Sequence, residues 1–242
     1  MELTPGGEAF VPIAERWISL FRDTGKIKEQ TLRQTLSVGG ADLINTYTFV
    51  PLYREYLSHN PETQLAIRTY HSGELYHMLE TRVIDIGYVY SQRRYPDILA
   101  RILYQEQMYV ICHRDSRYHD QITPGELSIK DEVYLRWSAD YEMWHDQHWP
   151  SGKSLVFVGT GAQIPLYLDV PDRWAIAPAS VYQALKNKEH IVRYTLTAPP
   201  PPLTCYEITH RYPKPSKETI IHTFREEVED FVHRSDLIAR FE

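Results

Sequence analysis

The strongest constraint on the fold is a regular alternation of apolar, strand-like runs with amphipathic, helix-like runs in the first part of the chain. Strands are expected at 35–41, 64–69 and 83–90, and helices at 46–59 and 72–81. The inner helix faces carry Phe49, Val50, Tyr53 and Leu57 in the first helix and Leu75, Met78 and Leu79 in the second. Because consecutive strands joined by helices pair in parallel, this region predicts a parallel sheet with helical crossovers.

A second alternating unit follows, beginning with a strong strand within 101–114. Further strands are expected at 133–137, 154–158, 173–177 and 203–210, with helices after 123–124, at 141–148, after 159–161 and at 216–233. The last helix buries Ile220, Ile221, Phe224, Val228, Phe231 and Val232. Two α/β units joined near 104–109 and 203–210 predict a hinged, two-lobed binder that holds its ligand between strand carboxyl ends.

The amino-terminal residues form an amphipathic helix pattern with an apolar stripe that has no evident partner in the chain. Thr4 is the expected cap and Pro5 the first helical residue. The stripe consists of Phe10, Ile13, Trp17, Leu20 and Phe21. From the pattern alone, packing on the chain's own core and pairing with a second copy are equally good explanations.

Composition narrows the functional classes. The chain has 242 residues, of which 43% are apolar, so it is long and apolar enough to build a globular core. Its net charge of -6 lacks the basic excess of a self-sufficient DNA binder. Cys112 and Cys205 both lie in strand-like runs, which argues against a disulfide framework or a structural zinc site. Without a membrane-span pattern or a signal peptide, the sequence predicts a cytoplasmic protein with no membrane partner.

Five segments, taken in order, resemble the LysR-type transcriptional regulators. Residues 3–10 resemble the junction of wing and linker helix, and 46–56 the first helix of the effector domain. Residues 85–89 resemble a strand of that domain, 104–111 its crossover, and 174–180 its late strand and turn. The resemblance implies a long linker helix followed by a two-lobed, periplasmic-binding-protein-like effector domain of the α/β class. It assigns 1–31 to the wing end and linker, 32–106 plus 207–242 to lobe I, and 107–206 to lobe II.

The same resemblance implies partners. Linker helices pair in the family, so the stripe is expected to form a homodimer or homotetramer. The lobes bind a small effector that changes how the assembly bends DNA. Met1 aligns with the end of the wing, so contact with DNA is expected only through a winged helix-turn-helix that is absent from this sequence. The chain is therefore expected to sense and assemble, and to contact no bases itself.

Four segments are candidates for the effector site because helix amino termini and strand ends converge there. Their residues are Ala41, Asp42, Leu43, Tyr90, Ser91, Trp137, Ser138, Thr160, Gly161 and Gln163. In the family, hydroxyl residues after the first strand commonly hold an effector carboxylate, and this chain has none at 41–43. An ionised Asp42 would repel such an acid, which favours a neutral, cationic or metal-bridged effector. Capping of the following helix is the preferred explanation of Asp42.

No residue pattern predicts catalysis, and neither a metal site nor a cofactor is expected. His145 and His148 share a helical face but lack a third ligand at suitable spacing, so a solvated polar face is expected. No serine lies in a G-x-S-x-G motif. The alternative to a regulator is a free-standing cytoplasmic small-molecule binding protein of the same fold. The apolar stripe distinguishes the regulator from the free-standing binding protein, because a free-standing binder is not expected to carry an exposed apolar stripe.

Overall fold

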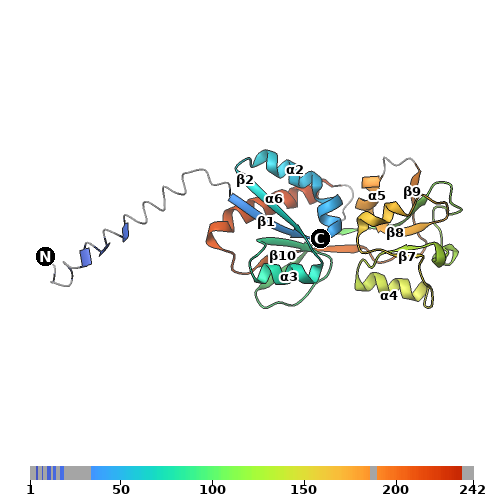
Figure 1. Ribbon diagram of the computed structural model, residues 1–242, viewed down its shortest axis with the longest axis horizontal. Coiled ribbons are helices and arrows are strands. Elements are labelled where there is room, and N and C mark those ends of the chain that lie inside the picture. Colours follow the sequence, from blue (N-terminus) through green and yellow to red (C-terminus); the bar gives the residue numbers. More distant parts are fainter. Residues whose placement is uncertain are drawn as a thin grey trace.

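The structure, a computed structural model, describes residues 34–185 and 190–235, together with positions 4, 7, 10, 11, 13, 14, 17 and 18. Two separate main sheets form the centres of two lobes, which lie side by side along the long axis (Figure 1). The expected two-lobed α/β architecture is confirmed. No helix within the described ranges has the length and apolarity needed to cross a bilayer.

The first lobe contains a five-stranded sheet with the order β2-β1-β3-β10-β4. Strands β1 (Gln34–Gly40), β2 (Thr63–Thr69) and β3 (Ile86–Val89) are parallel, as the sequence predicts. Strand β10 (Leu203–His210) returns from the second lobe and lies antiparallel between β3 and β4 (Ile98–Glu106). The sheet is therefore mixed. The sequence did not predict this, because a strand inserted from far along the chain carries no local signal of its direction.

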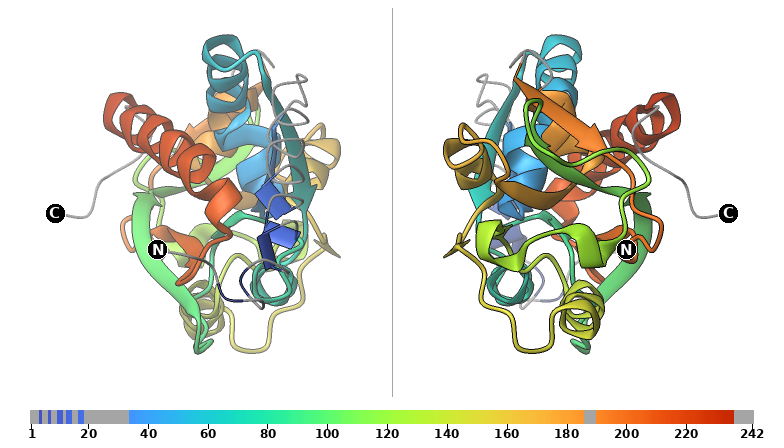
Figure 2. Two further views of the ribbon diagram at one scale, coloured as in Figure 1. Left: turned by 90° about the vertical axis from the view of Figure 1, so that its left-hand side faces the viewer. Right: turned by 90° about the vertical axis from the view of Figure 1, so that its right-hand side faces the viewer.

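Helices cover both faces of this sheet. Helices α2 (Val50–His59) and α6 (Glu218–Arg234) lie on one face, and α3 (Ser72–Glu80) lies on the other (Figure 2). Residues η5 (Pro215–Lys217) lead into α6. Successive strand residues pack into the cores on opposite faces of the sheet: Val38 and Tyr88 face α2 and α6, whereas Val89 faces α3.

A short π-helix, η1 (Ile44–Thr48), replaces the start of the expected helix at 46–59. The Phe49 N–H donates to the carbonyl of Ile44, five residues back, at 2.8 Å. This extra residue shifts the register of α2, so that Leu52, Tyr53 and Tyr56 form its buried face. The prediction that Leu57 points inward is therefore wrong, since Leu57 is 41% exposed.

The second lobe departs more from the predicted alternation. Its main sheet is antiparallel, with the order β8-β5-β9, from β5 (Met108–His113), β8 (Trp174–Pro178) and β9 (Ile191–Tyr194). A small parallel pair joins β6 (Val133–Tyr134) and β7 (Val156–Phe157). The helical elements are α4 (Ala139–His148), α5 (Ala179–Leu185), η2 (Pro124–Glu126), η3 (Ile129–Asp131) and η4 (Gly161–Leu166). Strand β9 and helix α5 were not predicted.

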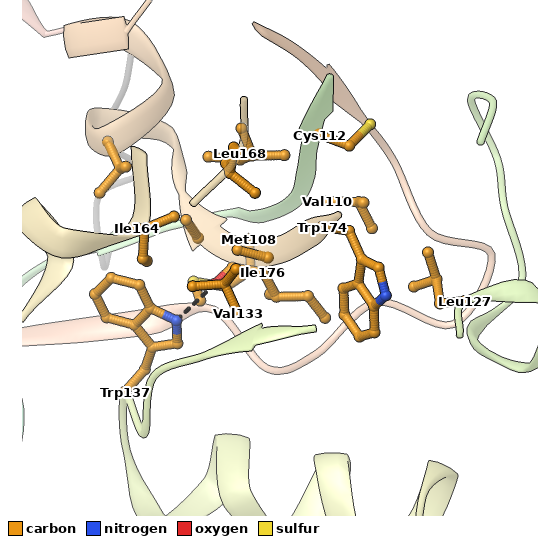
Figure 3. Close-up of a cluster of buried hydrophobic side chains, with 14 of the residues drawn as sticks. Met108, Val110, Cys112, Leu127, Val133, Trp137, Ile164, Leu168, Trp174 and Ile176 are labelled. Atoms are coloured by element: carbon orange, nitrogen blue, oxygen red, sulfur yellow. Dashed lines mark hydrogen bonds between the residues drawn. The ribbon is translucent and has the colours of Figure 1, made fainter. Parts of the chain in front are cut away.

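The core of the second lobe forms around β5 and β8. Side chains from both strands meet Leu127, Val133, Ile164 and Leu168 from the surrounding segments (Figure 3). Trp174 is fully buried, and its indole N–H donates to the Ser128 carbonyl at 2.8 Å. The sheet itself is short, so loops and short helices supply much of its cover.

The lobes meet where the chain crosses between the sheets. The expected strand within 101–114 divides at Gln107, because β4 ends in the first sheet and β5 begins in the second. Glu106, the last residue of β4, is completely buried at this crossing. Its carboxylate accepts a hydrogen bond from the Ser180 N–H of α5 at 2.9 Å. One carboxylate thus connects a strand of lobe I to a helix of lobe II.

The described positions of the amino-terminal segment agree with the predicted capped helix. The Thr4 hydroxyl accepts a hydrogen bond from the Gly7 N–H at 3.2 Å, and the described positions from 7 to 18 are helical. Phe10, Ile13 and Trp17 are exposed, with Trp17 at 73%. Leu20 and Phe21 lie outside the described residues. The role of the stripe in dimer formation stays a prediction.

Candidate effector site

A cavity of about 400 Å³ lies between the lobes at the carboxyl ends of the parallel strands. Lobe I contributes residues 41–43 after β1, Thr69 at the end of β2 with residues 70–72 and 74 after it, and Tyr90 after β3. Lobe II contributes residues 135–137 and 159–161. Parallel strands place their following turns at one edge of the sheet, which brings these separate segments together. We call this cavity the cleft.

Most of the residues predicted for the effector site line the cleft. They are Ala41, Asp42, Leu43, Tyr90, Trp137, Thr160 and Gly161. Ser91, Ser138 and Gln163 do not line it. The Ser138 hydroxyl instead accepts the Tyr141 N–H and caps α4, at 3.1 Å. The Gln163 side chain turns back to accept the N–H groups of Gly159 and Thr160. Contact between any of these residues and an effector stays a prediction.

The sequence interpretation missed the turn after β2 and the residues that precede Trp137. Tyr70, His71, Ser72 and Glu74 line the cleft, as do Leu135 and Arg136. The signal for the β2 turn was present, because β2 is expected beside β1 and parallel strands end at the same edge. Leu135 and Arg136 carried no such signal, since β6 ends at Tyr134 and the cleft residues follow it in irregular chain.

Asp42 does not cap the following helix, so that prediction is wrong. The Asn45 N–H donates to the Ala41 carbonyl, which places Asp42 inside the first turn and not before it. Asp42 Oδ1 accepts the Thr46 hydroxyl at 3.2 Å. Asp42 Oδ2 is buried and has no hydrogen-bond partner among the described residues. A carboxylate oxygen beside the cleft is thus left for another donor.

Asn45 fixes the turn that presents Asp42. Its side-chain amide donates to the carbonyls of Gly40 and Arg68 and to the Thr69 hydroxyl. Its side-chain oxygen accepts the Tyr53 hydroxyl at 2.7 Å. One amide therefore links the ends of β1 and β2 to α2, which makes the rim of the cleft in lobe I rigid.

Trp137 forms an aromatic wall on the side of lobe II. Its indole N–H donates to the Ile176 carbonyl at 2.7 Å, and the side chain joins the buried core of that lobe (Figure 3). Gly161 lies against this ring, since a Cβ at that position would be 3.4 Å from it. Across the cleft, burial raises the pKa of Tyr90 well above its ordinary value, so the hydroxyl stays protonated.

The charges around the cleft are mainly acidic. Asp42 and Glu74 carry carboxylates, and the Glu74 side chain accepts the His71 N–H at 3.1 Å. Arg136 is the basic side chain on the opposite side, and its guanidinium lies 2.7 Å from the Glu142 carboxylate. Because that arginine already has an acidic partner, the cleft does not present a free positive charge from it.

The histidine segment of α4 is not the solvated face that the sequence predicts. His145 is 7% exposed, and its Nε2 lies 3.0 Å from both carboxylate oxygens of buried Glu132. Burial raises the pKa of Glu132, and the hydrogen bond from His145 opposes this rise. Only His148 of the pair is exposed. Among the residues that the structure describes, no group of three or more His, Cys, Asp or Glu side chains could hold a metal ion.

Comparison with known sequences identifies one domain in the chain. Residues 29–148 match the LysR substrate binding domain family. The HTH-type transcriptional regulator CitR of Bacillus subtilis is 23% identical over 153 residues, which is 60% of this chain and 51% of CitR. The chain therefore spans about half the length of this curated relative.

Three of the solved structures that match in fold are regulators or their regulatory domains. A full-length OxyR variant from Pseudomonas aeruginosa matches with a TM-score of 0.71 and 19% identity, covering 95% of this chain and 78% of that one. The MexT regulatory domain from the same organism matches with a TM-score of 0.68 and 13% identity, covering 83% of this chain and 99% of that one. CbnR, a LysR family transcriptional regulator, matches with a TM-score of 0.65 and 20% identity, covering 94% of this chain and 81% of that one. By its domain match, the chain carries the LysR substrate binding domain that is found in the LysR-type transcriptional regulators.

Proposed function

We propose that the chain is the effector-sensing and oligomerising part of a DNA-binding transcriptional regulator. The observation that supports this most directly is the cleft of about 400 Å³, which lies between the two lobes at the strand carboxyl ends. A small molecule held there contacts both lobes and can change how they sit together. CbnR, similar in fold, has been solved with its target DNA. We infer that DNA contact requires a winged helix-turn-helix outside residues 1–242, and that the protein works in the cytoplasm.

The chemistry of the cleft supports an effector that carries a hydrogen-bond donor or a positive charge. The buried Oδ2 of Asp42 lacks a partner among the described residues, and Glu74 adds a second carboxylate. An acidic effector at that end of the cleft would be repelled. Trp137 supplies a flat apolar surface that suits the body of the molecule and attracts a cation held over its face.

The oligomer is part of the same proposal. The exposed Phe10, Ile13 and Trp17 form an apolar stripe on one helix, which suits pairing with the same helix of a second copy. The division into 1–31, 32–106 plus 207–242, and 107–206 also stays a prediction. The predicted boundary between 206 and 207 falls inside strand β10, which belongs to the first sheet from Leu203 onward.

The first experiment is a thermal-shift screen of amines, amino acids and neutral metabolites, since a ligand of the native state raises the melting temperature. Gly159 lines the cleft, and a Cβ there meets only the Gln163 side chain, at 3.8 Å. Gly159→Trp should therefore fill the cleft without disturbing the core and abolish the shift. Gly125→Trp is the matched control, because a Cβ there meets nothing within 4 Å and the residue lies outside the cleft. Equal shifts in both variants would contradict the assignment of the cleft.

Charge preference is tested with the hits from that screen. Asp42→Asn keeps the size of the side chain and removes its charge, so affinity for a cationic hit should fall about tenfold, equivalent to about 1.4 kcal/mol. Affinity for a neutral hit should change little. Tighter binding of cations by the variant would refute the proposed preference.

Assembly is tested by light scattering of the purified chain at micromolar concentration. We expect a dimer or a larger species, because the exposed stripe should bury its apolar surface. Trp17→Glu should shift the population toward the monomer. A monomeric parent chain would contradict the proposed role of the stripe and leave the cleft proposal standing.

A further inference from the structure

A second cavity, of about 470 Å³, lies between the lobes and shares no lining residue with the cleft. Its walls come from the end of η1 and the start of α2 in lobe I, from α5 in lobe II, and from the end of α6. We call it the rear cavity. Its volume is within the usual range of small-molecule sites, about 300 to 1,000 Å³.

Two buried hydroxyls in the rear cavity lack good hydrogen bonds. Thr48 is 7% exposed and Ser180 is 5% exposed, and both line the cavity. Neither hydroxyl has a hydrogen-bond partner of good geometry within the described part of the chain, although both lie near the Glu106 carboxylate and Thr48 also lies near the Tyr90 hydroxyl. Buried polar groups are nearly always paired in native proteins, so two such groups in one cavity point to a ligand or solvent that completes them.

Glu106 lies close to these hydroxyls. It is fully buried, and both hydroxyls are close enough to lower its pKa against the rise that burial causes. One of its carboxylate oxygens accepts the Ser180 N–H, and the other has no hydrogen-bond partner among the described residues. A group that enters this end of the cavity therefore meets the two hydroxyls, with the Glu106 carboxylate buried behind them. A hydrogen-bond donor suits that environment, whereas a second carboxylate would be repelled.

The other walls of the rear cavity are aromatic and apolar. Tyr47 and Phe231 provide ring surfaces, with Pro51 and Ala184 beside them. At the entrance, Arg234 and Glu55 form an ion pair at 2.9 Å, so their charges are already matched. An uncharged ligand with a planar body suits these walls, because it buries apolar surface without separating that pair.

We propose that the rear cavity is a second small-molecule site, which takes an uncharged aromatic molecule with a hydroxyl or amide donor at its inner end. This goes beyond the sensing proposed for the cleft. The occupant touches lobe I through Thr48 and lobe II through Ser180. Because residues 41–43 of the cleft run directly into η1, whose Tyr47 and Thr48 line the rear cavity, an occupant of one site changes the setting of the other.

The test uses 2-naphthol as the neutral probe and 2-naphthoate as its charged counterpart, with binding to the whole chain measured by calorimetry. Ala184 is exposed at the cavity wall, so Ala184→Trp should fill the cavity without affecting the core. Ala139→Trp is the matched control, since Ala139 is also exposed in lobe II but lines neither cavity. We expect saturable binding of 2-naphthol that weakens at least about tenfold in Ala184→Trp only.

Three further results decide the proposal. Binding of 2-naphthol should persist in Gly159→Trp, which blocks the cleft, and should weaken in the double variant Thr48→Val with Ser180→Ala. 2-Naphthoate should bind at least about tenfold more weakly than 2-naphthol. Absence of binding to the parent chain, equal binding in Ala184→Trp, or loss of binding in Gly159→Trp would overturn the proposal. None of these outcomes depends on whether the cleft binds a metabolite.

Discussion

The cleft lies at residues 41–43, just before η1, and the rear cavity lies at Tyr47 and Thr48, near the end of η1, yet the two are built by different means. The cleft is formed by turns that follow parallel strands, and its polar groups include Asp42 and Glu74. The rear cavity is formed by the sides of four helical elements, η1, α2, α5 and α6, and its polar groups include the hydroxyls of Thr48 and Ser180. The position of the first follows from sheet topology, and that of the second follows from helix packing.

The two cavities also differ in how deeply their walls belong to a core. Trp137 of the cleft is 9% exposed and packs within the main cluster of lobe II. Phe231 of the rear cavity is only partly buried and lies at the edge of the lobe I cluster. A ligand in the cleft therefore contacts part of the folded core, whereas one in the rear cavity contacts helix surfaces that can move with less loss of packing.

The largest expected effect separates these walls. Trp137→Ala should lower the free energy of unfolding by about 3 to 5 kcal/mol, since it leaves a cavity in the core and an unpaired carbonyl at Ile176. Phe231→Ala should cost only about 1 to 2 kcal/mol, because the ring is only partly buried. Chemical denaturation of both variants measures the difference. Equal losses would show that Phe231 of the rear cavity belongs to the core as much as Trp137 of the cleft does.

The next effect concerns Glu106, which lies behind the rear cavity. Burial raises its pKa in the folded protein above the ordinary value of 4.5. Between these two pKa values the folded state holds more protons than the unfolded state, so the free energy of unfolding falls as pH rises. Glu106→Gln keeps an oxygen acceptor for the Ser180 N–H and carries no charge. We expect it to be more stable than the parent at neutral pH and equally stable in acid.

Denaturation curves from about pH 4 to pH 7 give this comparison. Glu132 should leave a residual slope in both proteins, because burial raises its pKa as well. If the parent and the Glu106→Gln variant have parallel stability profiles, the pKa of Glu106 is the same in the folded and unfolded states, and the burial of its carboxylate would have no cost at neutral pH.

The smallest expected effect is that of Thr48→Val. The Thr48 hydroxyl is buried without a well-formed hydrogen bond, so its removal should change the free energy of unfolding by less than about 1 kcal/mol, toward higher stability. Thr46→Val on the exposed side of η1 is the comparison, and it should cost a little stability because its hydroxyl donates to Asp42 Oδ1. A loss greater than about 1 kcal/mol in Thr48→Val alone would mean that this hydroxyl is paired with Glu106 and unavailable to a ligand.

The sequence predicted the cleft far better than the rear cavity. The apolar run that forms β1 and the helix pattern after it were sufficient to indicate Ala41, Asp42 and Leu43, since strand ends define ligand sites in such folds. The rear cavity needs α5, whose seven residues give too short an apolar pattern to identify. It also needs the register of α2, which the π-turn at η1 shifts by an amount that no local pattern reveals.

Hydrogen-bond partners were predicted less well than element positions. Asp42 was expected to cap a helix and does not, because Ala41 occupies the position before the first turn. His145 was expected in solvent and is buried against Glu132, because the face of α4 that carries Tyr141 and Trp144 packs inward. In both cases a shift of one residue along a helix, or a rotation of its face, decides the environment of the side chain.

The sequence by itself determined the alternating strands and helices, the division into two α/β units, and the strand ends where a ligand can bind. These follow from periodicity, which depends only on neighbouring residues. Only the tertiary structure decided the antiparallel insertion of β10, the meeting of Glu106 with Ser180, and the hydroxyls of the rear cavity. Those contacts join residues separated by long stretches of chain, and their geometry depends on how complete elements pack against one another.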